Sequence, residues 1–137
     1  MSSRIDLHLH STASDGTFTP TELVHLALDK SMQVIALTDH DTTQGIQEAL
    51  DAARGTGLTV IPGVEVSTDV PGAHELHILG YHIDWHHAGL HQHLASLHRS
   101  LLDRAHRMLD RLAQAGCPLA WDHVTHLSNG GVVGRPH

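Results

Sequence analysis

Short apolar segments alternate with amphipathic segments through the first half of this chain, and the alternation limits the folds open to it. Residues 4–9, 33–37 and 58–61 have the length and apolar content of strands, whereas the stretches around 19–27 and 46–53 carry apolar residues at helical spacing. Strands joined through helices run parallel within one sheet. The sequence therefore predicts an α/β fold with a parallel sheet.

Helix-cap and turn signals mark the ends of these segments. The run Thr19-Pro20-Thr21-Glu22 has the pattern of a capping box with proline at the first helical position, so it predicts a helix start. Gly55 and Gly57 predict the end of the second helix. Pro62-Gly63 predicts a bend that separates the third strand from the apolar run 64–67.

The second half of the chain changes to a mainly helical pattern. Residues 77–81 are expected to form a fourth strand. Leucines and a methionine at helical spacing predict a long helix over 89–115, and a shorter helix is expected over about 122–127. We therefore divide the chain into residues 1–85, built from βα units, and residues 86–137, a mostly helical insertion.

Length and charge narrow the function classes. At 137 residues the chain is long enough for one domain and too short for a closed eight-stranded barrel of about 250 residues. The net charge of −7 divides into −9 over residues 1–85 and +2 over residues 86–137. Converging carboxylates in the acidic part need counter-charge, which divalent cations supply. A polyanionic partner would meet the second part.

Composition favours metal chemistry in a reducing compartment. Sixteen histidines stand against one Phe, one Tyr and two Trp, so stacking platforms for single-stranded nucleic acid are scarce. Cys117 is the single cysteine, which leaves no intramolecular disulfide and no thiolate cluster. Residues 1–4 run into a strand without an apolar signal core, and no stretch is long enough to span a bilayer. We expect a cytoplasmic protein with no membrane partner.

Several histidines and carboxylates occur at or near the ends of the predicted strands. They are His8, His10, Asp39, His40 and Glu65, and Asp15 lies on the loop after the first strand. His8 and His10 are two residues apart on a strand, so both point to one side. In parallel α/β folds, functional groups gather at the carboxyl ends of the strands. Imidazole and carboxylate together suit Zn²⁺, Mn²⁺ or Fe²⁺, and a buried Glu65 would need such a partner.

The remaining histidines are less well defined. His77 on the fourth strand is the expected ligand, but His74 and His82 lie near the same strand, and an exposed strand face could carry any of them. Eight further histidines between residues 86 and 126 are expected on the surface. Asp39 is not an obvious ligand, and its place beside His40 predicts that it orients a ligand.

Four motifs that occur in order along the chain resemble a known family. The motifs are Asp6-Leu7-His8-Leu9-His10-Ser11 with Ser14-Asp15-Gly16, Leu37-Thr38-Asp39-His40-Asp41, Pro62-Gly63-Val64-Glu65-Val66-Ser67 and His77-Ile78-Leu79-Gly80-Tyr81. Over essentially the whole chain they are similar to the PHP (polymerase and histidinol phosphatase) family, in its bacterial nucleotide phosphatase and 5′-to-3′ exoribonuclease branch. The resemblance implies the first part of a distorted (β/α)₇ barrel, incomplete in this chain, followed by a helical insertion.

The resemblance also implies a three-metal phosphoesterase centre. His8 and His10 would bind the first metal, Asp15 and His40 the second, Glu65 would bridge, and His77 would help to hold the third. Arg135 and His137 belong to the segment where this branch resumes its barrel, and they would lie near the substrate phosphate. Family members continue for about as long again and supply a later His-Pro-type ligand and a C-terminal Asp-x-His.

These ligands predict metal-dependent hydrolysis of phosphate esters of nucleotides or of the 5′ ends of short oligonucleotides. An amidohydrolase-type metallohydrolase is an alternative, because His-x-His on the first strand is shared chemistry, although Asp15 with Thr38-Asp39-His40 favours the phosphoesterase. A second alternative is a truncated, non-catalytic metal-binding fragment. Its exposed sheet edge would invite self-association.

Overall fold

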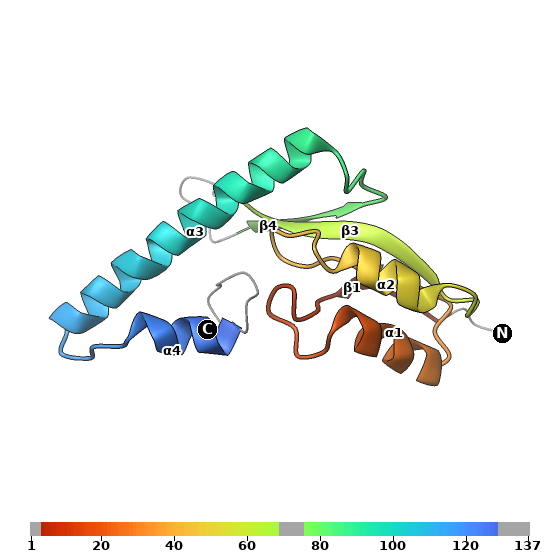
Figure 1. Ribbon diagram of the computed structural model, residues 1–137, viewed down its shortest axis with the longest axis horizontal. Coiled ribbons are helices and arrows are strands. Elements are labelled where there is room, and N and C mark those ends of the chain that lie inside the picture. Colours follow the sequence, from red (N-terminus) through yellow and green to blue (C-terminus); the bar gives the residue numbers. More distant parts are fainter. Residues whose placement is uncertain (1–3, 69–75, 129–137) are drawn as a thin grey trace.

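The chain folds around one four-stranded sheet, in the order β1-β2-β3-β4 (Figure 1). This computed structural model describes residues 4–68 and 76–128. Its elements are β1 (Ile5–Leu9), α1 (Pro20–Asp29), β2 (Val34–Leu37), α2 (Ile46–Ala53), β3 (Thr59–Thr68), β4 (Leu76–Tyr81), α3 (Ala88–Gln114) and α4 (Trp121–Ser128). The predicted α/β class is confirmed.

Helices α1 and α2 lie side by side and cover one face of the sheet (Figure 1). The predicted capping box is present: Thr19 accepts a hydrogen bond from the Glu22 backbone N–H, and the Glu22 side chain accepts one from the Thr19 N–H. Val24 of α1 and Ile46 of α2 are almost fully buried and pack in one cluster with Ile35 of β2. This core holds the carboxyl ends of β1 and β2 in place.

The predicted bend at Pro62-Gly63 is wrong, because β3 continues through both residues. Residues 59–62 pair in parallel with β2, and residues 63–68 pair with β4. The Pro62 carbonyl faces the β4 side, where it accepts a long hydrogen bond from Ile83 N–H at 3.4 Å. Pro62 therefore lies just outside the β4 ladder, at a position where no partner strand needs an N–H, and proline is tolerated.

The fourth strand departs from the parallel arrangement of the first three, since β4 is antiparallel to β3. The seven residues between Thr68 and Leu76 are fewer than the dozen or more that a parallel crossover requires. The sheet is also curled. The Tyr81 hydroxyl donates to the Leu7 carbonyl at 2.9 Å, although β4 and β1 would lie roughly 14 Å apart in a flat sheet, beyond the reach of one tyrosine.

Helices α3 and α4 form an arm beyond the sheet (Figure 1). Their bounds agree with the predicted helices to within one residue. Leu94 is the buried residue of α3, and most of the helix is exposed or half-buried. The His106 ring stacks on the Trp121 ring with centroids 4.0 Å apart, which ties α4 to α3. Among the described residues, no helix is both long enough and apolar enough to cross a membrane.

Candidate metal centre

Four histidines surround the buried carboxylate of Glu65. His8 Nε2 lies 2.6 Å and His10 Nε2 lies 3.1 Å from Glu65 Oε2, and His40 Nε2 lies 3.9 Å from the same oxygen. On the other side, His77 Nδ1 lies 3.0 Å from Glu65 Oε1. Glu65 is 6 % exposed, so its charge depends on these neighbours. The two oxygens of one carboxylate thus face histidines from different strands.

Backbone pairing beyond the strand ends brings these groups together. The chain after β2 keeps its register with β3, so that His40 forms an isolated parallel bridge with Glu65. Asp41 N–H donates to the Glu65 carbonyl at 2.9 Å, and Glu65 N–H donates to the Asp39 carbonyl at 3.2 Å. On β1 the pairing with β2 is irregular between Asp6 and Leu9. His10 lies just past that strand, and its ring centroid is 5.0 Å from that of His8.

Asp15 adds a second carboxylate from the loop after β1. Its Oδ1 lies 3.4 Å from His10 Nδ1, and its Oδ2 lies 3.8 Å from His40 Nε2. The loop is tightly turned, because the N–H groups of Ser14 and Gly16 both donate to the Ser11 carbonyl. A side-chain carbon at Gly16 would lie 2.2 Å from the His10 carbonyl oxygen. Glycine is therefore required for the turn that places Asp15 above His10.

These side chains fit divalent cations. Three overlapping groups have ligand atoms within 4.8 Å of one another: His8, His10 and Glu65; His10, Asp15 and His40; and His40, Glu65 and His77. Within residues 4–68 and 76–128, the Nδ1 atoms of His10 and His40 are buried without a hydrogen-bond partner, since the 3.4 Å approach of Asp15 to His10 lacks hydrogen-bond alignment. Such atoms are costly unless something binds them. Mixed imidazole and carboxylate donors are those that Zn²⁺ and related ions take.

The protonation states of the site also suit a cation. Burial lowers the pKa of His10, the charge of His40 lowers it further, and Asp15 and Glu65 oppose this only in part. Burial alone would raise the pKa of Glu65, but the hydrogen bond from His8 and the charges of His40, His8 and His10 lower it overall. Neutral imidazole and ionised carboxylate are the forms that bind metals.

Among the residues that the structure describes, six of the predicted side chains lie together. His8, His10, Asp15, His40, Glu65 and His77 form the cluster. Asp39 lies beside it, with its carboxylate bonded to Ser11 and Ser14. Arg135, His137 and the competing His74 lie outside the described residues.

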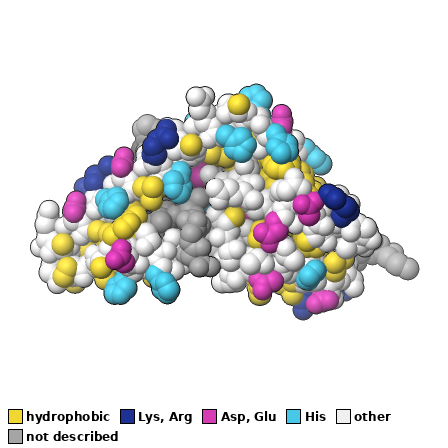
Figure 2. Space-filling model, viewed as in Figure 1, with side chains coloured by type: hydrophobic (Ala, Val, Ile, Leu, Met, Phe, Trp, Pro, Cys, Tyr) yellow, Lys and Arg dark blue, Asp and Glu magenta, His cyan; other side chains and the backbone are white. Residues whose placement is uncertain are grey.

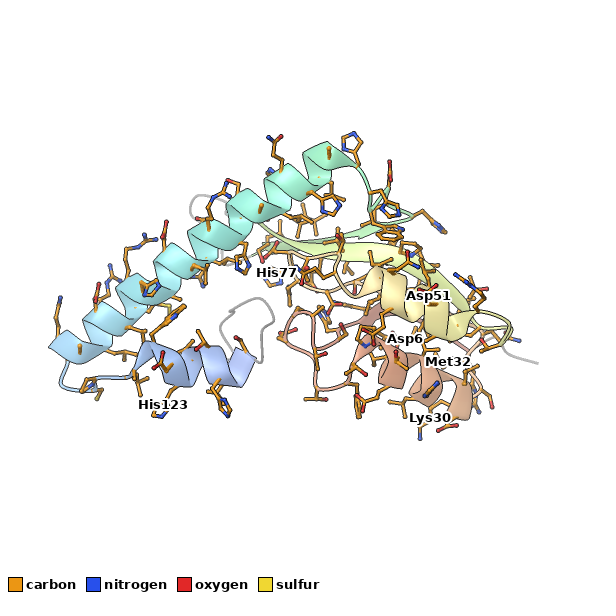
Figure 3. All side chains as sticks on the ribbon, in the orientation of Figure 1. Asp6, Lys30, Met32, Asp51, His77 and His123 are labelled. Carbon is orange, nitrogen blue, oxygen red and sulfur yellow. The ribbon has the colours of Figure 1, made fainter. Side chains whose placement is uncertain are left out.

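Most other described histidines lie on the surface of α3, α4 and the segment before α3, and Figure 2 shows histidines spread over this face, with several close together at its upper right. Figure 3 shows His123 on the outer side of α4, whereas His77 lies at the end of the sheet beneath α3. His82 is exposed and lies beyond the end of β4. Of the two described candidates near β4, His77 and His82, His77 is the one whose ring lies beside Glu65.

Asp41 is a buried carboxylate to which the sequence patterns assign no role. It is 3 % exposed, has a φ of 52°, and its Oδ1 accepts a hydrogen bond from Ser67 N–H at 2.9 Å. Its Oδ2 is buried without a hydrogen-bond partner among the described residues. The sequence shows a second aspartate directly after His40. Its contact with Ser67 spans 26 residues, so only the folded structure reveals it.

Comparison with known families and relatives gives a consistent result. The family model described as the PHP domain matches residues 6–133. The chain is 43% identical over 134 residues to "5'-3' exoribonuclease Rnm" of Salmonella typhimurium, covering 96% of this chain and 45% of that protein. It is 40% identical to the "3',5'-nucleoside bisphosphate phosphatase" of Chromobacterium violaceum, covering 97% of this chain and 47% of that protein. The chain thus spans about half the length of these relatives.

A solved structure agrees with the sequence comparisons. The fold matches a candidate metal-dependent phosphoesterase from Bifidobacterium adolescentis with a TM-score of 0.88 and 32% identity. The match covers 100% of this chain and 48% of that chain. The four-stranded sheet with its helices therefore corresponds to about half of a longer chain in that neighbour, which is consistent with a partial barrel.

Proposed function

The chain belongs to the PHP domain family, and from this we propose that it carries the N-terminal metal-binding part of a phosphoesterase acting on nucleotides or on the 5′ ends of short oligonucleotides. The observation that carries the proposal is the buried Glu65 carboxylate with four histidines within 4 Å. The names of the two relatives supply the substrate classes, one a nucleic acid and the other a nucleoside bisphosphate.

Each group of the cluster has its own part in the proposal. His8, His10 and Glu65 would hold one cation, Asp15 and His40 would hold a second, and His77 with Glu65 would hold a third. When bound, the cations supply Lewis acidity and lower the pKa of a water molecule. Arg135 and His137 are proposed to bind the substrate phosphate.

Several finer points belong to the same proposal. Mn²⁺, Zn²⁺ and Fe²⁺ all accept these donors, and up to three ions are proposed in the complete protein. We place the protein in the cytoplasm, because its single cysteine suits a reducing compartment. Ile5 and Leu7 on β1 are exposed large apolar residues, which supports self-association through that sheet edge when nothing else covers it.

Phosphate release tests this function, measured as inorganic phosphate from a phosphomonoester or as the mononucleotide freed from the 5′ end of an oligonucleotide. The complete protein is incubated with a nucleoside 3′,5′-bisphosphate or a 5′-phosphorylated oligonucleotide, with Mn²⁺ or Zn²⁺ added, beside its His8→Ala and His123→Ala variants. His123 is exposed on α4 and serves as the matched control. We expect phosphate release by the wild type and by His123→Ala. His8→Ala should lose this release, because it removes one ligand of the cation proposed to bind His8, His10 and Glu65.

The same assay separates the alternatives. Turnover of an amide substrate without phosphate release would favour the amidohydrolase chemistry. Cation binding without turnover of either substrate class would favour a non-catalytic metal-binding fragment. Equal phosphate release by the wild type and His8→Ala would refute the role proposed for the histidine cluster.

A further inference from the structure

The Asp39 carboxylate is buried and bonded to one loop. It is 2 % exposed and follows β2. Its Oδ1 accepts hydrogen bonds from Ser11 N–H at 2.6 Å and from the Ser14 hydroxyl at 2.7 Å, and its Oδ2 accepts one from the Ser11 hydroxyl at 2.7 Å. Hydrogen bonds to an ionised carboxylate are roughly twice as strong as neutral ones. Asp39 is thus joined firmly to the loop after β1.

Little space remains around this carboxylate. Ser11 is 0 % exposed and Ser14 is 2 % exposed. A side-chain carbon at Gly45 would lie 3.1 Å from Asp39 Oδ2 and 3.1 Å from Ser11 Oγ, so the backbone before α2 closes directly over this bond. Because close packing limits the access of water here, the Asp39 oxygens rely on these loop donors for their hydrogen bonds.

The loop that Asp39 holds is the one that carries Asp15. Ser14 Oγ lies 2.7 Å from Asp39 Oδ1 and 3.4 Å from Asp15 Oδ1, and its single proton goes to the nearer acceptor. Asp15 is left free of a strong donor on that side, and its carboxylate faces His10 and His40. Ser14 therefore stands between a carboxylate that anchors the loop and one that is available to a cation.

We propose that Asp39, through Ser11 and Ser14, is a positioning residue that sets Asp15 against His10 and His40, and so determines the affinity of the cation subsite these three form. The inference deepens the proposed function and relies on it for the presence of cations. It assigns Asp39 no contact with the substrate. The subsite of His8, His10 and Glu65 shares His10 but does not include Asp15, so its affinity for a cation should change less than that of the subsite that contains Asp15.

Two readouts in the complete protein test the anchor, for Asp39→Asn and Ser14→Ala beside Asp15→Ala. The control is Asp29→Asn, which makes the same change at an exposed position of α1. The first readout is a Mn²⁺ titration that counts the ions and their affinities. The second is amide hydrogen exchange of Ser11, Ser14 and Gly16 in protein without cations.

We expect one Mn²⁺ to bind roughly 10–100-fold more weakly in Asp39→Asn, as is usual when a residue that orients a metal ligand is lost. The loss of Mn²⁺ affinity in Ser14→Ala should be smaller. The same ion should be the one lost in Asp15→Ala. The loop amides should exchange faster in both variants, and Asp29→Asn should match the wild type. Unchanged Mn²⁺ affinities with unchanged loop exchange would overturn the proposal.

Two further outcomes are covered by this design. If Asp39→Asn does not fold, Ser14→Ala decides, because it removes a single hydroxyl. If the wild type binds no Mn²⁺, the proposed function fails, and loop exchange alone then decides whether Asp39 anchors the loop. Faster exchange with all Mn²⁺ affinities unchanged would overturn the positioning role while leaving the phosphoesterase proposal intact.

Discussion

A methyl group at Gly63 tests how closely β3 must approach β2 and β4 at the residue where its pairing with β4 begins. In Gly63→Ala the new carbon would lie 2.8 Å from the Gly80 carbonyl oxygen, 2.8 Å from Thr38 Cγ2 and 3.1 Å from the Leu37 carbonyl oxygen. Two of these atoms are backbone of β4 and β2, and Thr38 is fully buried. The strands have to move apart to admit the methyl group.

The magnitude follows from these distances. The contact with Thr38 Cγ2 is about 0.7 Å shorter than the ~3.5 Å at which two carbon atoms attract best. Overpacking of this kind costs about 1–3 kcal/mol, and the reduced freedom of alanine in the unfolded chain returns about 0.4–1 kcal/mol. We therefore expect Gly63→Ala to lower the free energy of unfolding by about 1–2 kcal/mol, the difference of these two effects.

Gly80→Ala is the matched control on the neighbouring strand. There the added carbon would meet Ile83 Cγ2 at 3.4 Å, Val64 Cγ1 at 3.7 Å and the Val64 carbonyl at 3.9 Å, which are ordinary contacts. This variant should keep its stability or gain up to about 1 kcal/mol. Urea unfolding of both variants in the presence of a chelator measures the difference, provided the slopes agree. Equal midpoints, or a larger loss in Gly80→Ala, would refute the reasoning.

Three further predictions concern charge and cations. Mn²⁺ at about 100 times its dissociation constant should raise the free energy of unfolding by about 2.7 kcal/mol. Glu65→Gln should largely abolish this gain, and thermal melts with Mn²⁺ and with a chelator measure the difference. Folding lowers the pKa of His10, so its neutral ring contributes stability above the ordinary histidine pKa near 6.5. Without cations, the free energy of unfolding should therefore fall as the pH drops below that value. His10→Gln should reduce that pH dependence. Backbone and side-chain hydrogen bonds with Thr19 lower the pKa of Glu22, so its carboxylate should stabilise the fold above the ordinary carboxyl pKa. This stabilisation should vanish in acid, where Glu22→Gln and the wild type should have equal free energies of unfolding.

Local patterns were sufficient to predict most of the fold. The capping box at Thr19, the apolar spacing of α1, α2 and α3, and the length of β2 are properties of neighbouring residues, and the structure agrees with them. The hydrogen bonds of Asp39 and Asp41 are different, because their partners lie 25 to 28 and 26 residues away. No local pattern specifies such contacts, so the anchor at Ser11 and Ser14 could not be predicted.

The unbroken strand β3 also shapes the candidate metal centre. Beyond residue 62 it gains β4 as a partner on one side, while on the other side the chain after β2 keeps its register with β3 as far as the bridge between His40 and Glu65. The Oε2 atom of Glu65 faces histidines from β1 and from the end of β2, and its Oε1 faces His77 of β4. Because β3 runs unbroken through Pro62-Gly63, Glu65 lies between two groups of histidines, one on each side of the strand.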